Sequence, residues 1–559
     1  MRMDTEHQGN NFPPYFYLVA SIIVAIFMIG VSLYFRPLLP IDETRYTSVA
    51  WEMWHGGDWL VPHKNGLPYA HKPPVLFWLI NLSWMLFGVN DVATRMIVPL
   101  LACCNFFLIY QLGKRLYGKH SQAAELSPLV LLSFCILALY LSMTLFDLLL
   151  TVFLLSSVIC LLKAAQENKI KWGAVAGFWA GIGVLVKGPV ILAYLFPLFV
   201  SYPFWRQDGW LPNRKWLVVC LLSIIITAVV ALLWAIPAAM QGGEEYAQAI
   251  FWGQTAGRVS ESFAHARPFY WYVLFLPVLT LPWLFFLGCW RSRIFSQMSQ
   301  ADKFCLSWLV LTVLLFSCFS GKQPHYLLPV FPAMAVFLAA KLNLKLFGKE
   351  PLLALLLLIL AIAMFSGPWW IGAAFKAAQN PEVHPLWGLV PLFLAVVAIK
   401  PAVFQKFRLP VLLLAIPVSV YALLPFVSPV LFQLYDLSEL AQQLNKKQTE
   451  GHVVAISGNY HGQYQYLGRL EEPLVVIGDK NTEEYLWLAQ HPNAWAVIAT
   501  RNVDTYIEQH AVQIWPYRGR KNVLISAADL FQWPDWKLYT PVIDQKLTEK
   551  KVAVNSDLE

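Results

Sequence analysis

The sequence PIDETRY at residues 40–46 directly follows an apolar run, residues 15–35, that is long enough to cross a bilayer. Two further charged turns lie beside apolar runs, VKGP at residues 186–189 and SGKQPHY at residues 320–326. A charge at the middle of a membrane helix costs about 2.5–3.5 kcal/mol on insertion scales. Such charges are kept mainly where they line a site or a pathway. The three segments therefore predict a polar pocket at one face of a membrane protein, suited to a charged, lipid-linked substrate.

Composition indicates a polytopic membrane protein. The 559 residues are 58% hydrophobic and only 13% charged, whereas about a quarter of the residues of a soluble protein are charged. The 24 Trp and 23 Tyr residues suit interfacial aromatic belts. Cytoplasmic loops beside anionic lipid account for the net charge of +8, so no nucleic-acid partner is expected. The eight cysteines all lie within apolar runs and predict no disulfide framework.

Apolar runs predict about 13 membrane helices by the 20-residue rule. They lie at residues 15–35, 92–112, 126–142, 145–162, 172–186, 190–204, 216–240, 270–290, 304–320, 326–340, 352–375, 385–399 and 409–426. The first run is too long for a signal-peptide core, and we expect it to remain as an anchor.

Basic residues follow every second predicted span. They are Lys114, Arg115, Lys119, Lys163, Lys169, Lys171, Arg206, Arg214, Lys215, Arg291, Arg293, Lys303, Lys341, Lys345, Lys349, Lys400, Lys406 and Arg408. The positive-inside rule places these loops and the N-terminus in the cytoplasm. The other loops, which carry Asp42, Asp147, Lys187 and Lys322, then face the far side of the membrane, the periplasm of a bacterium. An odd number of spans sends the C-terminus there as well.

The first outer loop contains two segments that we expect to lie on the membrane surface. Residues 73–87 are apolar but short, and a span at this point would reverse the charge pattern of every later loop. Residues 44–54 mix apolar and charged side chains, as interfacial amphipathic helices do. Because Pro40 ends the preceding helix, Asp42 is expected at the N-cap of this surface helix. The alternative is that its carboxylate faces a substrate cavity.

The composition changes near residue 428. Strand-like runs at 452–456, 473–477, 494–499 and 522–525 alternate with helix-like runs at 437–447, 483–490 and 503–510. The sequence thus predicts two domains, a transmembrane catalytic domain over residues 1–427 and a small α/β domain over residues 428–559.

Several motifs resemble those of a known family. The first loop contains DETRY at 42–46, GDWLVPH at 57–63 and KPP at 72–74. It resembles the first periplasmic loop of the lipid A aminoarabinose transferases, which are GT-C membrane glycosyltransferases related to the protein O-mannosyltransferases. The resemblance implies about 13 membrane helices, two juxtamembrane helices and a periplasmic C-terminal domain, which agrees with the topology above. SGKQPHY, with His325 where we expect a small hydroxyl residue, resembles a further family segment.

The resemblance also implies functional residues. Asp42, Glu43 and Asp147 correspond to acidic positions, and Lys72, Lys187, Arg258 and Lys322 to candidate phosphate ligands. The candidate substrate-lining residues are Arg45, Tyr46, His265, Arg267, His325 and Tyr326. Each lysine alone could simply extend its ammonium to the membrane–water interface. Asp147 alone could be a carboxylate that stabilises the start of a helix. As a set they suit a phosphate, because Arg offers a bidentate fork and Lys a point charge.

The reaction follows from the leaving group. A polyprenyl phosphate sugar donor carries its own leaving group, so no nucleotide pocket is needed and none is visible in the sequence. The cations would neutralise the departing phosphate. Asp42 would act as general base toward a hydroxyl acceptor. Toward an anionic lipid A phosphate, Asp42, Glu43 or Asp147 would instead bind the amino group of the sugar.

The expected activity is the inverting transfer of 4-amino-4-deoxy-L-arabinose from undecaprenyl phosphate to lipid A at the bacterial inner membrane. No cofactor is expected to be required. A divalent metal stays an alternative that the sequence does not support, because the outer histidines lack a spacing such as His-x-x-x-His. One alternative is a related GT-C transferase that uses another polyprenyl-linked sugar and a protein or glycan acceptor. The other is a flippase for lipid-linked sugars, although the inverted repeat typical of transporters is not evident.

Overall fold

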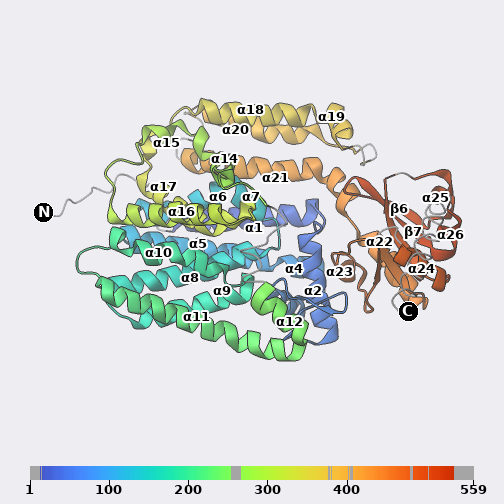
Figure 1. The fold of residues 1–559 in the computed structure, drawn as a ribbon. Coiled ribbons are helices and arrows are strands. Elements are labelled where there is room, and N and C mark those ends of the chain that lie inside the picture. The colour runs from blue at the N-terminus through green and yellow to red at the C-terminus, as the bar shows by residue number, and fades with distance from the viewer. Residues whose placement is uncertain are drawn as a thin grey trace.

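The computed structural model describes residues 13, 15–253, 266–375, 378, 381–400, 402, 404, 407–478, 482–501 and 503–533. It has two parts (Figure 1), a bundle of long helices that run side by side and a smaller domain with a sheet at one end of that bundle. In Figure 1 the smaller domain lies at the right.

The bundle is built almost entirely of helices, because its sequence is apolar over long stretches. Its elements are α1 (Phe16–Phe35), α2 (Asp42–Gly56), β1 (His63–Lys64), β2 (Leu67–Pro68), α3 (Val75–Phe87), α4 (Asp91–Arg95), α5 (Ile97–Tyr117), α6 (Gln122–Ser133), α7 (Cys135–Tyr140), α8 (Phe146–Glu167), α9 (Lys171–Lys187), α10 (Val190–Trp205), α11 (Asn213–Gly242), α12 (Glu244–Gln248), η1 (Ala249–Gly253), α14 (Trp271–Leu279), η2 (Trp283–Phe285), α15 (Leu287–Arg291), α16 (Gln300–Cys318), η3 (Pro324–Val330), α17 (Phe331–Lys341), η4 (Leu344–Leu346), α18 (Pro351–Phe365), α19 (Gly367–Ala374), η5 (Pro385–Gly388), α20 (Leu389–Ile399) and α21 (Arg408–Tyr435).

Six of the described helical stretches are long and apolar enough to cross a membrane by themselves: α1, α4 with α5, α8, α11, α16, and α21 with the helix after it. A seventh candidate, α18 with α19, bends by 77°. Each of the other predicted spans corresponds to a shorter or interrupted helix. The span predicted at 126–142, for example, breaks between α6 and α7 at Phe134, whose backbone is extended. Hydropathy therefore located every apolar run, but hydropathy alone does not reveal where a helix breaks within a run.

The predicted basic loops meet at one end of the bundle. Arg115 contacts Gln166 at 3.2 Å. Lys341 pairs with Asp302 at 2.9 Å, and the same carboxylate accepts a hydrogen bond from Tyr117 at 2.7 Å. These contacts join the ends of α5, α8 and α17 to the start of α16. They confirm that loops predicted to share a side of the membrane lie together.

Two short helices and a hairpin make up the first long loop at the opposite end. α3 has 13 residues, about 20 Å of helix, against about 30 Å of hydrocarbon, so it is too short to span. Leu86 and Phe87 at its end are exposed, as an interfacial helix requires. The β1–β2 hairpin turns at Asn65 and Gly66, both with positive φ. This Asn-Gly pair is a strong hairpin signal that the sequence analysis overlooked.

The smaller domain contains α22 (Ser438–Thr449), β3 (Val454–Ser457), α23 (Gln465–Gly468), β4 (Val475–Ile477), α24 (Thr482–Gln490), β5 (Trp495–Thr500), α25 (Thr505–His510), β6 (Gln513–Tyr517), β7 (Arg520–Ser526) and α26 (Ala527–Gln532). Its sheet has the order β4-β3-β5-β7-β6. β3 pairs in parallel with β4 and β5, and β7 pairs antiparallel with β5 and β6.

All four predicted strands of this domain are present, but β6 was not predicted because Pro516 interrupts its pattern. The predicted domain boundary at residue 428 falls inside α21, which continues to Tyr435. The apolar end of α21 therefore carries the chain directly into the smaller domain, as Figure 1 shows.

The smaller domain is clamped to the first loop by residues around α23. Tyr466 stacks on Trp84 with ring centroids 5.3 Å apart and planes within 2°. The Tyr466 hydroxyl lies 2.9 Å from both Asp91 and Thr94. The Trp51 indole donates to the Leu470 carbonyl at 2.8 Å. The clamp fixes the domain against α2, the helix on which Asp42 lies.

Close packing of α9 on α11 helps to place Lys187, the last residue of α9, at the same end of the bundle as Asp42. Gly173, Gly177 and Gly181 form a stripe at four-residue intervals, the small-residue pattern that lets membrane helices approach closely. A Cβ atom on Gly177 would lie 2.4 Å from the Ser223 carbonyl oxygen of α11.

Candidate active site

Asp42 lies at the mouth of the candidate site. It is the first residue of α2 and is not the N-cap; Ile41 occupies that position and no side chain caps the helix. The expectation of a capping role is therefore wrong. The side chain is 54% exposed. It accepts hydrogen bonds from Arg45 and, at 3.3 Å, from the Tyr46 hydroxyl. Asp42 is thus a solvent-accessible carboxylate held by two predicted substrate-lining residues.

Glu43, the next residue, is buried and fully engaged. It forms a two-pronged ion pair with Arg36 at 2.5 and 3.0 Å. It also accepts from the backbone N–H groups of Leu39 at 3.0 Å and Thr144 at 2.8 Å. Burial by itself would raise the pKa of Glu43, but Arg36, Arg95 and the Thr144 N–H together hold that pKa below its ordinary value. These contacts favour a role in positioning α2 over the catalytic role expected from the sequence.

Phe146, at the start of α8, joins the first loop to the rest of the site. Its ring packs edge-on against Tyr46 with centroids 4.7 Å apart and against Phe77 of α3 at 5.8 Å. The Lys72 ammonium lies 5.6 Å from the centre of the same ring, within the range of a cation–π contact. Lys72 is half-buried. The aromatic cluster brings the predicted phosphate ligand Lys72 next to Tyr46, which in turn holds Asp42.

Asp147 and Lys187 form a buried pair beside this cluster. The Lys187 ammonium donates to Asp147 at 2.6 Å, and the two side chains are 10% and 4% exposed. Lys187 also lies 4.9 Å from the centre of the Tyr326 ring. The Tyr194 hydroxyl donates to the Tyr326 carbonyl at 2.5 Å and fixes that turn. Lys187 therefore already has an anionic partner, which weakens its expected role as a phosphate ligand.

His325 links the two groups of charges. Burial lowers the pKa of His325 to about 4. The carboxylates of Asp147 and Asp42 oppose this lowering, whereas Lys187 and Lys72 add to it. Both carboxylates and both lysines are therefore within electrostatic reach of one neutral imidazole. Five residues selected from sequence segments far apart along the chain converge at this point.

Lys322 is placed differently from the expectation. It is 3% exposed, and its ammonium donates to the backbone carbonyls of Arg267, at 2.9 Å, and Phe319. It ties the turn after α16 to the segment before α14, where Ala266 bridges to Gly321. Arg267 itself is exposed. The predicted residues Arg258 and His265 lie outside the described residues.

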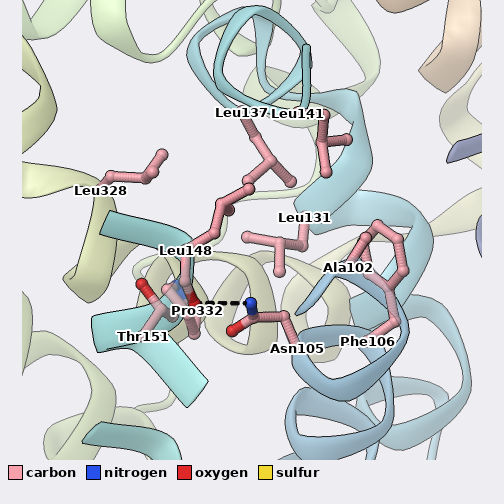
Figure 2. Close-up of a pocket in the computed structure, with 10 residues that line it drawn as sticks. All are labelled: Ala102, Asn105, Phe106, Leu131, Leu137, Leu141, Leu148, Thr151, Leu328 and Pro332. Atoms are coloured by element: carbon pink, nitrogen blue, oxygen red, sulfur yellow. Dashed lines mark hydrogen bonds between the residues drawn. The ribbon is translucent and has the colours of Figure 1, made fainter. Parts of the chain in front are cut away.

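Two cavities of the described structure are lined by other residues. A cavity of about 10 Å³ (Figure 2) lies within the bundle, where Asn105 donates to the Leu148 carbonyl at 3.0 Å. Leucines and Phe106 make up most of its wall, and it is too small for a sugar. A second cavity of about 260 Å³ lies between the C-terminal half of α2, the β1–β2 hairpin and residues 465–473. Over the described part of the chain, no group of three or more His, Cys, Asp or Glu side chains could hold a metal ion.

Known proteins share both the sequence and the fold. Residues 71–234 match the family model of dolichyl-phosphate-mannose-protein mannosyltransferase. An undecaprenyl phosphate-alpha-4-amino-4-deoxy-L-arabinose arabinosyl transferase from Erwinia tasmaniensis is 30% identical over 333 residues, 58% of each chain. The enzyme of the same name from Edwardsiella ictaluri is 30% identical over 372 residues, 63% of this chain and 64% of the relative. The chain therefore matches less than two thirds of the length of these relatives.

The fold comparison extends over almost the whole chain. The crystal structure of ArnT from Cupriavidus metallidurans bound to undecaprenyl phosphate superposes with a TM-score of 0.71 at 19% identity, covering 92% of this chain and 98% of that one. The chain is thus similar in sequence to aminoarabinose transferases over part of its length and shares the fold of ArnT. The match to the mannosyltransferase model includes Lys72, Asp147 and Lys187, whereas Asp42 precedes it.

Sequence reasoning missed several residues around the candidate site. Arg36 and Arg95 were not selected from the sequence, although Arg36 pairs with Glu43 and Arg95 donates to the Arg36 carbonyl at 3.2 Å. Lys64 and His461 were also missed, because the contact between the Lys64 hairpin and the His461 loop depends on the docking of the smaller domain. The Asn65-Gly66 turn could have revealed the hairpin that presents Lys64.

Proposed function

We propose that this chain transfers 4-amino-4-deoxy-L-arabinose, with inversion, from undecaprenyl phosphate to a phosphate of lipid A at the periplasmic face of the bacterial inner membrane. The observation that carries the proposal is a continuous set of contacts at one end of a membrane bundle. It links Asp42 and Lys72 through Tyr46 and Phe146, and it links the Asp147–Lys187 pair to His325 through Tyr326. The similarity to named arabinosyl transferases supports the choice of donor and sugar.

The reaction needs one bond to form and one to break. An acceptor phosphate oxygen attacks the anomeric carbon from the side opposite the carrier. The bond between that carbon and the carrier phosphate oxygen breaks, and undecaprenyl phosphate leaves with the electron pair. Lys72 is placed to neutralise the charge that develops on the leaving phosphate. A charge pair of this kind is worth about 4 kcal/mol at 4 Å and an effective dielectric constant near 20, before desolvation.

The surroundings of the three carboxylates assign them to two different roles. Glu43 and Asp147 are buried in ion pairs, so they hold α2 and α8 in register. Asp42 is exposed and is assigned the contact with substrate. An anionic acceptor needs no general base, so Asp42 binds the amino group of the sugar; with a hydroxyl acceptor it would remove the proton.

The proposed product explains why such a reaction would be useful to a bacterium. Adding a cationic sugar to a lipid A phosphate lowers the negative charge of the outer surface, which weakens electrostatic attraction of cationic peptides. The proposed partners are the polyprenyl donor, lipid A and inner-membrane lipid, with no nucleic acid.

The test uses purified protein in nanodiscs with the synthetic donor lipid and lipid A. We expect free undecaprenyl phosphate and aminoarabinose-modified lipid A to appear together by mass spectrometry. Asp42→Asn should reduce the rate at least about 100-fold, whereas Asp208→Asn, at the basic end, should leave it unchanged. Full transfer by Asp42→Asn would refute the assigned role. Movement of intact donor without release of carrier would indicate a flippase, and transfer only to a protein or glycan would indicate the other alternative.

A further inference from the structure

The sheet of the smaller domain has one edge that is suited to ligand binding. β3 is parallel to β4 and β5, and β6 runs the same way as β5 because both are antiparallel to β7. The carboxyl ends of these four strands therefore share an edge. The chain passes from β3 outward to β4 and then returns to β5 on the other side of β3. Open α/β sheets bind ligands at the carboxyl edge, at such a topological switch point.

Two turns at this edge carry basic side chains. The loop after β3 contains His461 between two positive-φ glycines, Gly458 and Gly462. The turn between β6 and β7 places Arg518 and Gly519 at positive φ, the geometry of a tight two-residue hairpin turn. Arg518 is exposed, and His461 is half-buried.

The same edge rests on the first loop of the bundle. A Cβ atom on Gly462 would lie 3.1 Å from Cγ of Lys64 in the β1–β2 hairpin. Gln465 donates to the Asn65 side chain at 2.7 Å, and the Tyr466 N–H donates to the Ser48 hydroxyl of α2 at 3.2 Å. Lys64 therefore lies beside the loop that carries His461. We term Lys64, His461 and Arg518 the cationic rim; Arg518, Arg45 and Asp42 are within electrostatic reach of His461.

The charges of the rim are not balanced. The pKa of His461 is lowered by burial and by the cations Arg45, Lys64 and Arg518, with Asp42 acting in the opposite direction. The carboxylate facing Lys64 is Glu52, which already accepts from the N–H groups of Asn65 and Gly66.

Arg45 is paired with Asp42. Over the described residues, no carboxylate lies within ion-pair distance of Lys64 or Arg518. Two cations without a carboxylate partner, the half-buried Lys64 and the exposed Arg518, favour the binding of an anion at this edge.

We propose that the cationic rim, Lys64 with His461 and Arg518, is the docking site for a phosphate on the acceptor glycolipid, so that the smaller domain selects the acceptor. The proposal rests on the proposed function, because it places the acceptor near Asp42, the residue assigned the contact with substrate. Lys64 and Arg518 supply charge-assisted hydrogen bonds to the phosphate, and the clamp around Tyr466 holds them at a fixed place above α2.

Steady-state kinetics in nanodiscs test the proposal. The variant combines Lys64→Gln, which keeps the side-chain stem against Gly462, with Arg518→Asn, since Asn tolerates positive φ. The matched control is Lys446→Gln, an exposed cation in the last turn of α22, which leads into the amino end of β3 and therefore lies at the opposite edge of the sheet.

We expect the KM for lipid A to rise about tenfold in the double variant, with the KM for the donor and kcat within about twofold of wild type. Unchanged donor kinetics show that the variant is folded. The control should match wild type for both substrates. An unchanged KM for lipid A, or an equal rise for donor and acceptor, would overturn the proposal. If the wild-type protein transfers no sugar to lipid A, the proposed function itself has failed, which is a different result.

Membrane phospholipid offers the same phosphate chemistry as the acceptor. The measurements are therefore repeated in nanodiscs of zwitterionic lipid alone. We expect the rise in the KM for lipid A to persist there. A rise that is present only with anionic phospholipid would show that the rim binds the membrane surface, and the acceptor assignment would be wrong.

Discussion

Two aspartates at the same end of the bundle show how surroundings separate residues of one type. Asp42 is open to solvent and held by Arg45 and Tyr46, whereas Asp147 is buried against Lys187. The sequence could select both, since each is an acidic residue at an outer membrane boundary. It could not rank them, because the pairing of Asp147 depends on the contact between α8 and α9, and the exposure of Asp42 depends on how α2 packs. The same reason explains why Glu43 and Lys322 were expected to contact substrate.

Glu43→Gln should destabilise the protein by about 3–5 kcal/mol, because it leaves Arg36 charged and without its buried partner. The folded-state pKa of Glu43 lies below its ordinary value of 4.5, so the ion pair contributes its full stability above pH 4.5 and loses it as the pH falls through the folded pKa. Thermal unfolding in detergent between pH 7 and pH 3.5 should show a steeper loss below pH 4.5 for wild type than for Glu43→Gln. Equal slopes would contradict the assigned positioning role.

His325→Gln should change the pH dependence of stability in a different window. The unfolded chain binds a proton at this histidine near pH 6.5 and the folded protein only near pH 4. Stability is therefore complete above pH 6.5 and falls by about 3 kcal/mol as the pH drops to 4. Thermal unfolding should show that His325→Gln flattens this decline, while His120→Gln, an exposed histidine at the basic end, does not. A decline that is the same in both variants would place His325 in a more polar setting.

At the scale of elements, the β1–β2 hairpin is the joint between the two domains. The Asn65 side chain accepts from the Leu474 N–H at 2.9 Å and donates to the Leu474 carbonyl at 2.8 Å. Asn65→Gly keeps the positive φ but removes these two hydrogen bonds and the one to Gln465. The loss should destabilise the contact between the two domains by about 1–3 kcal/mol. We expect faster amide hydrogen exchange over residues 460–474. Asn168→Gly, at the positive-φ end of α8, is the control and should leave that segment protected.

The glycine stripe of α9 gives a second test at this scale. Gly177→Ala forces a methyl group toward the Ser223 carbonyl and should separate α9 from α11, with a loss of about 1–3 kcal/mol. Because α9 carries Lys187, transfer activity should fall as well. Gly30→Ala in α1 has no atom within 4 Å of the new methyl and should not lower the melting temperature. Equal effects of the two substitutions would argue against close packing as the cause.

At the scale of the whole molecule, the sequence predicted the apolar runs, the grouping of the basic loops and the four main strands. These features follow from local composition and period. It did not predict the broken helices, the end of α21 or the docking of the smaller domain, because each of these is decided by contacts between distant segments. Tyr466 and Thr94, for example, are 372 positions apart in the sequence.

The orientation of the molecule is open to a direct labelling test. In a background with Cys318→Ser, Lys446→Cys should react with a membrane-impermeant thiol reagent in intact spheroplasts. Lys119→Cys, at the basic end, should react only after permeabilisation. The reverse pattern would place the Asp42 end in the cytoplasm and exclude periplasmic lipid A as the acceptor.

The pairing of Tyr466 with Trp84 has a consequence for biogenesis. A ribosome that adds about 5–20 residues per second needs on the order of 20–80 seconds to proceed from Trp84 to Tyr466. During that interval Trp84 and its neighbours have left the insertion machinery without their aromatic partner. The emerging chain must therefore be shielded by lipid or by a chaperone until its final hundred residues have crossed the membrane.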